Sequence, residues 1–312
     1  MELDTRKSTL TASKRRAGQY ELKVNGVPQS VVSMIEPTDL EYAYIRHIAR
    51  AIDAAAPADS SLFTVHLGAG ALTLARYVEA TRPGSPQLVV EFEPALYAAV
   101  VTALPLAAGH QVRAIFGDAR AVADAALPRD EEPAGAGAPP LGGDARAARP
   151  HARESDDTTS SIRTAGAADW VGAHFTVVDL WDAAVIHRRV ASQEFYTRVA
   201  ARSTADGVVA VNLLDGHPFD YSRRQAATLA TVFEHIAVVL DAEPEDDEGP
   251  LGNVLVFASN RPLDIAAHPE LLGEPLPHIV HGEALTTWID AARPMTDADC
   301  VDSPDPDDPR WD

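Results

Sequence analysis

The stretch LFTVHLGAGALTLAR, residues 62–76, contains a strand, a glycine turn and the start of a helix in direct succession. Leu62 to Leu67 form a short apolar run, Gly68 and Gly70 interrupt it, and an apolar helical pattern follows. Glycine lets the backbone approach a ligand closely, and the N-terminus of the following helix presents unpaired N–H groups. The stretch therefore predicts a strand–loop–helix unit whose loop is either a nucleoside-binding loop or only a tight turn.

The same alternation of strands and helices continues along the chain. Short apolar runs are separated by segments with helical periodicity, and the last two runs are placed to pair as an antiparallel hairpin. Strands that alternate with helices form a mostly parallel sheet covered on both faces. We therefore predict an α/β fold with a doubly wound, mostly parallel sheet of seven strands. These strands are expected near residues 62–67, 87–93, 110–118, 174–180, 207–214, 236–241 and 253–259.

Composition divides the chain into segments. Residues 1–17 are polar and are expected to be flexible, whereas residues 18–60 are expected to form a β-hairpin with an Asn-Gly turn, followed by a helix. The main domain is expected over residues 61–294. Within it, residues 128–168 are rich in Pro, Gly, Ala and charge, so a disordered insertion is predicted there. The acidic residues 295–312 are expected to form a disordered tail for the same reason.

The net charge narrows the classes of partner. The 312 residues carry a formal charge of −20, whereas nucleic acids and anionic membrane surfaces are bound through clustered Lys and Arg, so neither is expected as a partner. No segment is long and apolar enough to cross a bilayer, and the N-terminus lacks the apolar region of a secretory signal. Cys300 is the single cysteine, so no disulfide framework exists, and a cytoplasmic location is expected.

Acidic side chains stand at the ends of the second and third expected strands. Ligands of open parallel sheets bind beyond the carboxyl ends of the strands. Glu91 follows Gly70 by 21 positions, a spacing at which an acid can accept hydrogen bonds from both ribose hydroxyls, and Glu93 is the neighbouring candidate. Asp118 can accept a hydrogen bond from the amino group of an adenine, while the backbone N–H of Ala119 donates one to a ring nitrogen. The alternatives are a solvated loop acid in the first case and a helix cap in the second.

A pair of acids follows the fourth expected strand, in the motif DLWD. Asp179 stands where the strand meets the same cleft, and Asp182 follows on the loop. Burying a carboxylate without a partner is costly, so two of them beside a pocket suit a cationic or amine substrate, as counter-charge or as general base. The alternative is a helix cap and a surface acid. Trp181 between them is interpreted as a packing wall.

In chain order, these residues resemble the spermidine synthase (polyamine aminopropyltransferase) family. The resemblance covers roughly residues 20–127 and 170–260. It implies the Rossmann-like sheet of class I methyltransferases, with a small N-terminal β-hairpin element. Members are commonly dimers or tetramers, which leaves a homo-oligomer open. The motifs that carry the resemblance are VNGVPQS, LEYAYIRHI, LGAGALT, VVEFE, GDA and DLWDA.

The resemblance also implies roles for single residues. Gln29, at the end of the hairpin motif, would reach the nucleoside, and Tyr44 would lie on the substrate side. Glu91 would hold the ribose and Asp118 the adenine. Asp179 would meet the attacking amine and act as its base.

The implied activity is transfer of an aminopropyl group from decarboxylated S-adenosylmethionine to a small-molecule amine such as putrescine. Ala71 stands where the family loop has an Asp that faces the amino group of the donor, and Asn212 stands where the family has a Gln. Because an acid at position 71 would repel a donor carboxylate, an S-adenosylmethionine-dependent methyltransferase is an alternative. A nucleoside-binding protein without turnover is a third.

No metal site is expected. His278 and His281 in the motif HIVH are three positions apart, but no acidic third ligand is apparent.

Overall fold

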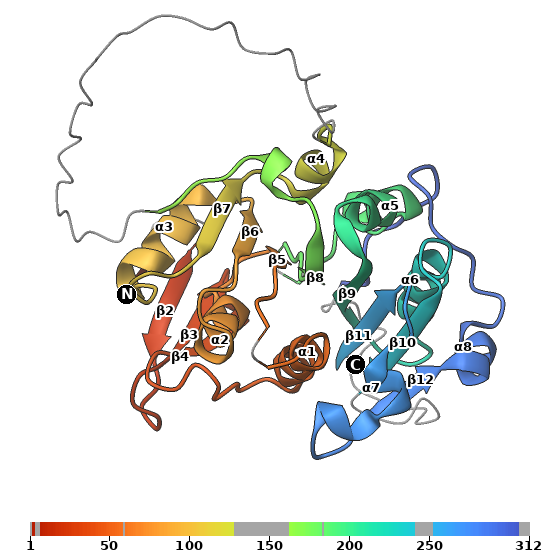
Figure 1. Cartoon of the computed structure of the whole chain (residues 1–312), viewed down its shortest axis with the longest axis horizontal. Helices are drawn as coiled ribbons and strands as arrows, with labels where there is room; N and C mark the ends of the chain where they lie inside the picture. Colours follow the sequence, from red (N-terminus) through yellow and green to blue (C-terminus); the bar gives the residue numbers. More distant parts are fainter. Residues whose placement is uncertain are drawn as a thin grey trace, which may run out of the picture.

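The computed structural model describes residues 2–3, 7–58, 60–127, 162–182, 184–240 and 252–305. A central sheet of eight strands, in the order β12-β10-β11-β9-β8-β5-β6-β7, runs through the main domain (Figure 1). Its strands are β5 (Thr64–Leu67), β6 (Gln87–Glu91), β7 (Val112–Phe116), β8 (Ala173–Val178), β9 (Ser203–Asp215), β10 (His235–Leu240), β11 (Gly252–Ser259) and β12 (His278–His281).

The predicted α/β class and the mostly parallel sheet are confirmed, but the predicted number of seven strands is wrong. Strands β5 to β9 pair in parallel, whereas β11, β10 and β12 continue the sheet in antiparallel pairs. The eighth strand is the HIVH motif, which pairs with β10 so that Val280 lies opposite Val238. Four residues, two of them histidines, show too little alternation to be read as a strand, and only the pairing with β10 makes them one.

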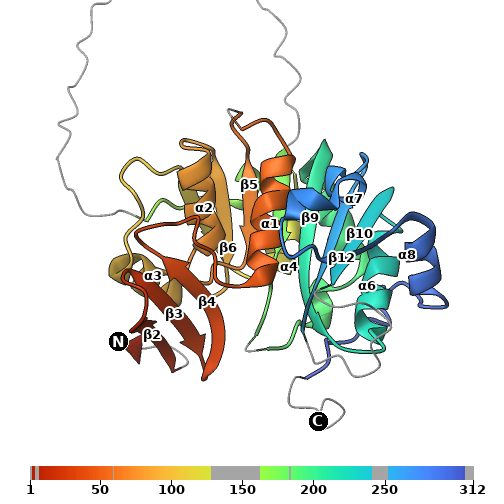
Figure 2. The ribbon, with the colours of Figure 1, turned by 90° about the horizontal axis from the view of Figure 1, so that it is seen from below.

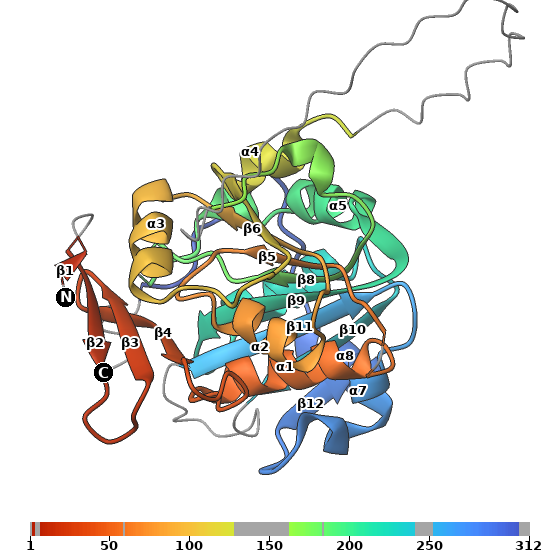
Figure 3. The same ribbon diagram turned by 60° about the vertical axis from the view of Figure 1, so that its left-hand side comes forward.

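Helices cover both faces of the central sheet. Figure 3 shows α4 and α5 on one side of the strands, and α1 and α2 on the other. The first face also carries α6 and α8, and the second also carries α3 and α7. The helices are α1 (Ala43–Ala54), α2 (Thr73–Thr81), α3 (Pro94–Ala103), α4 (Ala119–Asp124), α5 (Gln193–Ala201), α6 (Asp220–Leu229), α7 (Asp264–Ala267) and α8 (Gly282–Ile289). No helix within the described ranges is long and apolar enough to cross a membrane.

Strand β8 shows why this sheet forms. Phe175 and Val177 face the layer of α1, and Val178 faces the layer of α4 and α5, so the strand is apolar on both sides. Helix α1 meets it with Ile48 and Ile52, which lie one turn apart on one face. Each such side chain contributes about 1.5–3 kcal/mol when fully buried. A strand buried on both faces therefore brings its polar residues to its end, which is where Asp179 follows.

The N-terminal residues form a second, antiparallel sheet. It consists of β1 (Glu2–Leu3), β2 (Ser8–Ala12), β3 (Gln19–Val24) and β4 (Val27–Ser33), in that order. Figure 2 shows β2, β3 and β4 beside α3 at one end of the molecule. The predicted hairpin turn is confirmed, since Asn25 and Gly26 both have positive φ (52° and 86°).

The expectation that residues 1–17 are flexible is wrong for β2. The strand pairs with β3, and Leu10 is buried with Leu22 against Leu96 and Val100 of α3. Ser8 and Leu10 point inward alternately with more exposed neighbours. A five-residue strand with one large apolar side chain gives little signal alone, and its stability comes from β3 and α3.

The predicted disordered insertion ends earlier than expected. Residues 128–161 lie outside the described residues, but residues 162–168 run along the edge of β7. The backbone N–H of Ala114 donates to Arg163 (2.8 Å), and the N–H of Ala165 donates to the Ala114 carbonyl (2.8 Å). This isolated bridge satisfies both backbone groups of Ala114, at the middle of the edge strand β7.

The expected disordered tail is likewise wrong for residues 295–305, while residues 306–312 lie outside the described residues. Met295 and Ser303 are buried, and Ser303 Oγ accepts a hydrogen bond from the backbone N–H of Ile186 (2.8 Å). Arg120 of α4 binds both carboxylate oxygens of Asp297 (2.7 Å each). Acidic composition alone suggests disorder, but here one acid has a bidentate arginine partner and the apolar residues between the acids reach the core.

Replacing Asp297 with Asn is expected to lower the melting temperature near neutral pH and to have less effect in acid. Hydrogen bonds from Arg120 lower the pKa of Asp297 to about 2. A carboxyl group with a depressed folded-state pKa stabilises the protein above its unfolded pKa of about 3.9, and this stabilisation is lost as the pH falls toward the folded value. Thermal unfolding of wild type and variant from pH 7 to acid tests this. Asp290→Asn, at an exposed acid, is the control, and a melting-temperature gap that does not change with pH would contradict the assignment.

Candidate active site

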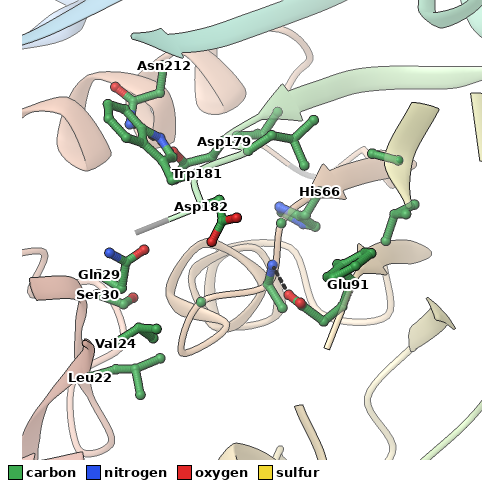
Figure 4. Close-up of a pocket in the computed structure, with 18 of the residues that line it drawn as sticks. Leu22, Val24, Gln29, Ser30, His66, Glu91, Asp179, Trp181, Asp182 and Asn212 are labelled. Atoms are coloured by element: carbon green, nitrogen blue, oxygen red, sulfur yellow. Dashed lines mark hydrogen bonds between the residues drawn. The ribbon is translucent and has the colours of Figure 1, made fainter. Parts of the chain in front are cut away.

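One cavity of about 850 Å³ opens at the carboxyl ends of β5, β6, β7 and β8 (Figure 4). Leu22, Val24, Gln29 and Ser30 of the N-terminal sheet line one side of it, and Glu91 lies on the other. Strand ends that are far apart in sequence thus supply one site. Nine candidate site residues from the sequence line this cavity: Gln29, Tyr44, Gly68, Gly70, Glu91, Asp118, Ala119, Asp179 and Asp182.

Gly68 is required by the approach of β8 to β5. Its φ is +94°, and a Cβ atom placed on it would lie 2.3 Å from the carbonyl oxygen of Asp179. The backbone N–H of Asp179 donates to the Leu67 carbonyl (3.0 Å), which draws the two strand ends together. In this structure the glycine therefore makes room for the backbone of Asp179, whereas the sequence left open a nucleoside-binding loop and a tight turn.

Hydroxyl groups attach the N-terminal sheet to the glycine loop. Thr73, at the start of α2, donates to the Val31 carbonyl (3.2 Å), so the hydrogen bond between Ser30 Oγ and Thr73 Oγ1 (2.9 Å) has Ser30 as donor. Ser30 directly follows Gln29 on β4. The pair therefore fixes the backbone that carries Gln29 at the side of the cavity.

Glu91 is held by two backbone groups. Its Oε2 accepts from the N–H of Ala69 in the glycine loop (3.0 Å), and its Oε1 accepts from the N–H of Glu93 (2.8 Å). Burial raises the pKa of Glu91, and the hydrogen bonds from Glu93 and Ala69 oppose that rise. The backbone hydrogen bond from Phe92 also opposes the rise, and a carboxylate offers about four acceptor sites, so the group can still accept from a ligand hydroxyl. Glu93 also lines the cavity, but it is Glu91 that is fixed by the glycine loop.

Asp118 serves as a helix cap and still faces the cavity. Its Oδ1 accepts from the backbone N–H of Ala121 in α4 (2.9 Å) and lies 3.2 Å from Nη2 of Arg189. None of the described residues donates a hydrogen bond to Oδ2. The cap and a ligand contact are therefore compatible, because they use different oxygens.

Asp179 is oriented by hydrogen bonds on one oxygen only. Trp181 Nε1 (2.6 Å) and Asn212 Nδ2 (2.8 Å) both donate to Oδ1, and Asn253 Nδ2 in turn donates to Asn212 Oδ1 (3.0 Å). Burial raises the pKa of Asp179, while the hydrogen bonds from Asn212 and Trp181 lower it. No donor among the described residues reaches Oδ2, so this oxygen can take a proton from a ligand.

Tyr44 and Asp182 occupy different depths of the cavity. Tyr44 stacks on Tyr42 with ring centroids 5.9 Å apart, and burial, followed by the charge of Asp179, raises its pKa well above 10. Its hydroxyl therefore stays protonated and can donate to a ligand. Asp182 is 43% exposed and pairs with Nε2 of His187 (3.1 Å), which places it at the rim.

Sequence reasoning missed several cavity residues. Trp181 was interpreted as a packing wall, yet its indole N–H binds Asp179 directly. Asn253 on β11 reaches the site only because β11 pairs with β9, which no local pattern reveals. His66 does give a local signal, because a histidine inside the short apolar run TVHL is a polar residue at a buried position.

The interpretation of Ala71 as a ligand-facing position is wrong for this chain. Ala71 is fully buried and packs with Leu22, Val24 and Leu96 between the N-terminal sheet and α3. It is not among the residues that line the cavity, whereas its loop neighbours Ala69 and Gly70 are. The N-terminal sheet packs against the loop, and this packing turns the Ala71 side chain into the core. The sequence alone does not show it.

Replacing Ala71 with Asp is therefore expected to destabilise the protein without strengthening ligand binding. The substitution would bury a carboxylate among aliphatic side chains, at a cost of about 1–3 kcal/mol or more in the free energy of unfolding. Urea titration measures this loss, and the smaller, uncharged Ala71→Ser is the matched control. Tighter binding of an amine-bearing nucleoside by the Asp variant would contradict the assignment of Ala71 to the core.

Within the part of the chain that the structure describes, no group of three or more His, Cys, Asp and Glu side chains could hold a metal ion. His278 and His281 belong to the edge strand β12.

Comparisons with known proteins support the fold. No protein-family model matches this sequence, and no curated protein matches it. Among solved structures, a probable spermidine synthase from Corynebacterium glutamicum superposes with a TM-score of 0.72 at 21% identity, over 93% of this chain and 92% of that one. A spermidine synthase from Thermotoga maritima (TM-score 0.46, 11% identity, 90% and 84%) and human methyltransferase-like protein 13 (0.45, 17%, 82% and 92%) superpose less well.

The first of these superpositions covers nearly the whole length of both chains. In the central sheet, the parallel strands β7-β6-β5-β8-β9 are continued by the antiparallel strands β11, β10 and β12. The chain thus has a Rossmann-like α/β fold of the methyltransferase type, preceded by a small antiparallel sheet.

Proposed function

We propose that this protein transfers an aminopropyl group from decarboxylated S-adenosylmethionine to a small-molecule amine such as putrescine. One observation carries the proposal: the glycine loop and the acids at the carboxyl ends of β6, β7 and β8 open into a single cavity, where Asp179 keeps one carboxylate oxygen for a ligand. The resemblance of the motifs to spermidine synthases supports the same reading.

The nucleoside half of the donor is assigned to the side of the cavity near β6 and β7. The Glu91 carboxylate, which its backbone partners hold in place, accepts hydrogen bonds from the ribose hydroxyls. Oδ2 of Asp118 accepts a hydrogen bond from the adenine amino group, and the backbone N–H of Ala119 donates one to a ring nitrogen. Gln29 closes on the nucleoside from the N-terminal sheet.

Asp179 is assigned as the base of the transfer. The lone pair of the amine nitrogen attacks the propyl carbon bonded to the sulfonium, the carbon–sulfur bond breaks, and methylthioadenosine leaves with the bonding electrons. The proton of the new ammonium passes to Oδ2 of Asp179, while Trp181 and Asn212 hold Oδ1. Such a positioned base is typically worth about 10²–10⁴ in rate, and alignment of the two substrates supplies a further part.

The amine is assigned to the side of Asp179, Tyr44 and Asp182. A raised pKa makes Asp179 a stronger base than an exposed carboxylate, and the Tyr44 hydroxyl donates rather than ionises. Asp182 at the rim provides a second negative charge, which favours a dication over a simple amine. The net charge of −20 adds a long-range attraction for cations.

Release of methylthioadenosine tests the proposal. Purified protein is incubated with decarboxylated S-adenosylmethionine together with one amine at a time: putrescine, cadaverine, spermidine or a monoamine. Release that depends on the amine is expected, with the diamines fastest. If none of the amines raises the release of methylthioadenosine above the amine-free control, aminopropyl transfer is rejected. A nucleoside-binding protein without turnover is then favoured.

A methyltransferase that uses intact S-adenosylmethionine is the second candidate. The observation in its favour is that the glycine loop presents no acid to the cavity, because Ala71 packs into the core. A donor carboxylate would meet no repulsion there. Calorimetric binding of the two donors separates the candidates: preference for the decarboxylated form supports aminopropyl transfer, and preference for the intact form supports methyl transfer.

A further inference from the structure

His66 is a buried polar residue at the base of the cavity that the proposed reaction does not use. It is 5% exposed and lines the cavity. It belongs to β5, which lies between β8 and β6 in the sheet, and Figure 4 shows its ring between Asp179 and Glu91. The ring therefore lies beneath any ligand that reaches from the end of β6 to the end of β8.

A chain of hydrogen bonds fixes the tautomer of His66. Gln87 Nε2 donates to the Ala75 carbonyl (3.0 Å), so Gln87 presents its oxygen to His66 Nε2 (3.0 Å). An amide oxygen only accepts, which means that Nε2 carries the proton. Burial lowers the pKa of His66 to about 4, so the ring is neutral at physiological pH. Nδ1 is then left with a lone pair.

That lone pair opens on the cavity. None of the described residues forms a hydrogen bond with Nδ1. Nδ1 is also absent from the fully enclosed polar atoms that lack a partner, so it retains accessible surface. A neutral acceptor at the base of a pocket suits a cationic donor such as a primary ammonium. Unlike another carboxylate, it adds no charge beside the base, Asp179.

We propose that Nδ1 of His66 accepts a hydrogen bond from the primary ammonium of the donor's aminopropyl chain. This inference rests on the proposed function for the identity of the donor. With the ribose at Glu91 and the acceptor amine at Asp179, the aminopropyl chain lies over the end of β5, where His66 is. Ala71 cannot meet the ammonium because it lies in the core, and Asp182 is paired with His187 at the rim. His66 is thus a specificity residue that distinguishes the complete donor from its nucleoside part.

Binding of two nucleosides to matched variants tests the proposal. Methylthioadenosine has no primary amine, whereas decarboxylated S-adenosylmethionine has one. His66→Asn places an amide oxygen where Nδ1 lies, and His66→Gln reaches Gln87 but has no acceptor at the Nδ1 position. We expect His66→Gln to weaken binding of the decarboxylated donor about tenfold or more, in line with loss of a hydrogen bond to a charged group. The same variant should change methylthioadenosine binding less than about twofold, and His66→Asn should retain most of the donor affinity.

Other outcomes overturn the proposal. If both variants weaken the two nucleosides equally, His66 acts only through packing, and if neither nucleoside is affected, it contacts no ligand. A rise in the KM of the diamine, with unchanged donor binding, would assign Nδ1 to the acceptor substrate instead. His66→Leu, which lacks both polar contacts, is a second variant, and its methylthioadenosine affinity and melting temperature report whether it folds.

Failure of the proposed function can be distinguished from failure of the His66 proposal. Wild-type protein that binds both nucleosides but transfers nothing contradicts aminopropyl transfer, while the comparison of His66 variants still decides the binding claim. Wild-type protein that binds neither nucleoside overturns both.

Discussion

Replacing Asp179 with Asn is expected to lower kcat by about 10²–10⁴-fold, the range typical of a positioned general base. The amide keeps an oxygen for the hydrogen bonds from Trp181 and Asn212, so the geometry of the site is retained. It cannot take the ammonium proton. Steady-state release of methylthioadenosine measures the loss, and KM for the donor should change little because the nucleoside contacts lie elsewhere.

The same substitution is expected to raise the melting temperature near neutral pH. Burial raises the pKa of Asp179 above its unfolded value, so folding favours the protonated form. The stability contribution of such a group is fully present below the unfolded pKa and is lost as the pH rises through the folded pKa. At neutral pH the ionised group therefore costs stability, and the neutral amide removes that cost. A rise of about 2–4 °C would correspond to roughly 1 kcal/mol in a domain of this size.

Opposite signs for activity and stability are diagnostic of a buried functional carboxylate. Asp182→Asn is the matched control, because Asp182 is an exposed acid three positions away and should show no comparable rise in melting temperature. Asp179→Asn with unchanged activity would contradict its role as base. A lower melting temperature would show instead that the charge is compensated in the folded protein.

Replacing Glu91 with Gln is expected to weaken methylthioadenosine binding by about 10–100-fold, equivalent to a hydrogen bond to a charged group. A glutamine has one acceptor oxygen, so it cannot serve both Ala69 and Glu93 and also two ribose hydroxyls. One backbone N–H loses its partner. Isothermal titration calorimetry with methylthioadenosine and adenine separates the ribose contact from the base contact, since adenine binding should be nearly unchanged.

Glu93→Gln provides the control for that experiment. Glu93 also lines the cavity, but its known contact with Glu91 is through its backbone N–H, which the substitution retains. We expect its methylthioadenosine affinity to stay within about threefold of wild type. If Glu93→Gln shows the larger loss, the ribose contact has been assigned to the wrong acid.

The strand ends were predictable because their signals are local. Apolar runs that finish in Gly68, Glu91, Asp118 or Asp179 carry both the strand and its functional end in a few residues. Parallel pairing then places these ends at one edge of the sheet, whatever the details of packing. For that reason, the candidates that follow the parallel strands line one cavity, whereas Gln29 reaches it from β4 and Tyr44 from α1.

The elements that were mispredicted depend on partners distant in sequence. Strand β12 exists through β10, strand β2 through β3 and α3, and residues 295–305 through Arg120 and the main core. The direction of Ala71 is set by the N-terminal sheet, and Asn253 reaches Asp179 only through the pairing of β11 with β9. Composition and periodicity describe one segment at a time, so they do not predict these contacts between distant segments.

A crystal structure with methylthioadenosine tests the central claim most directly. The account predicts the ribose hydroxyls on the Glu91 carboxylate, the adenine amino group at Asp118 and the sulfur atom pointing toward Oδ2 of Asp179. A nucleoside bound away from these three carboxylates, or bound with its sulfur turned from β8, would contradict it and leave only the fold.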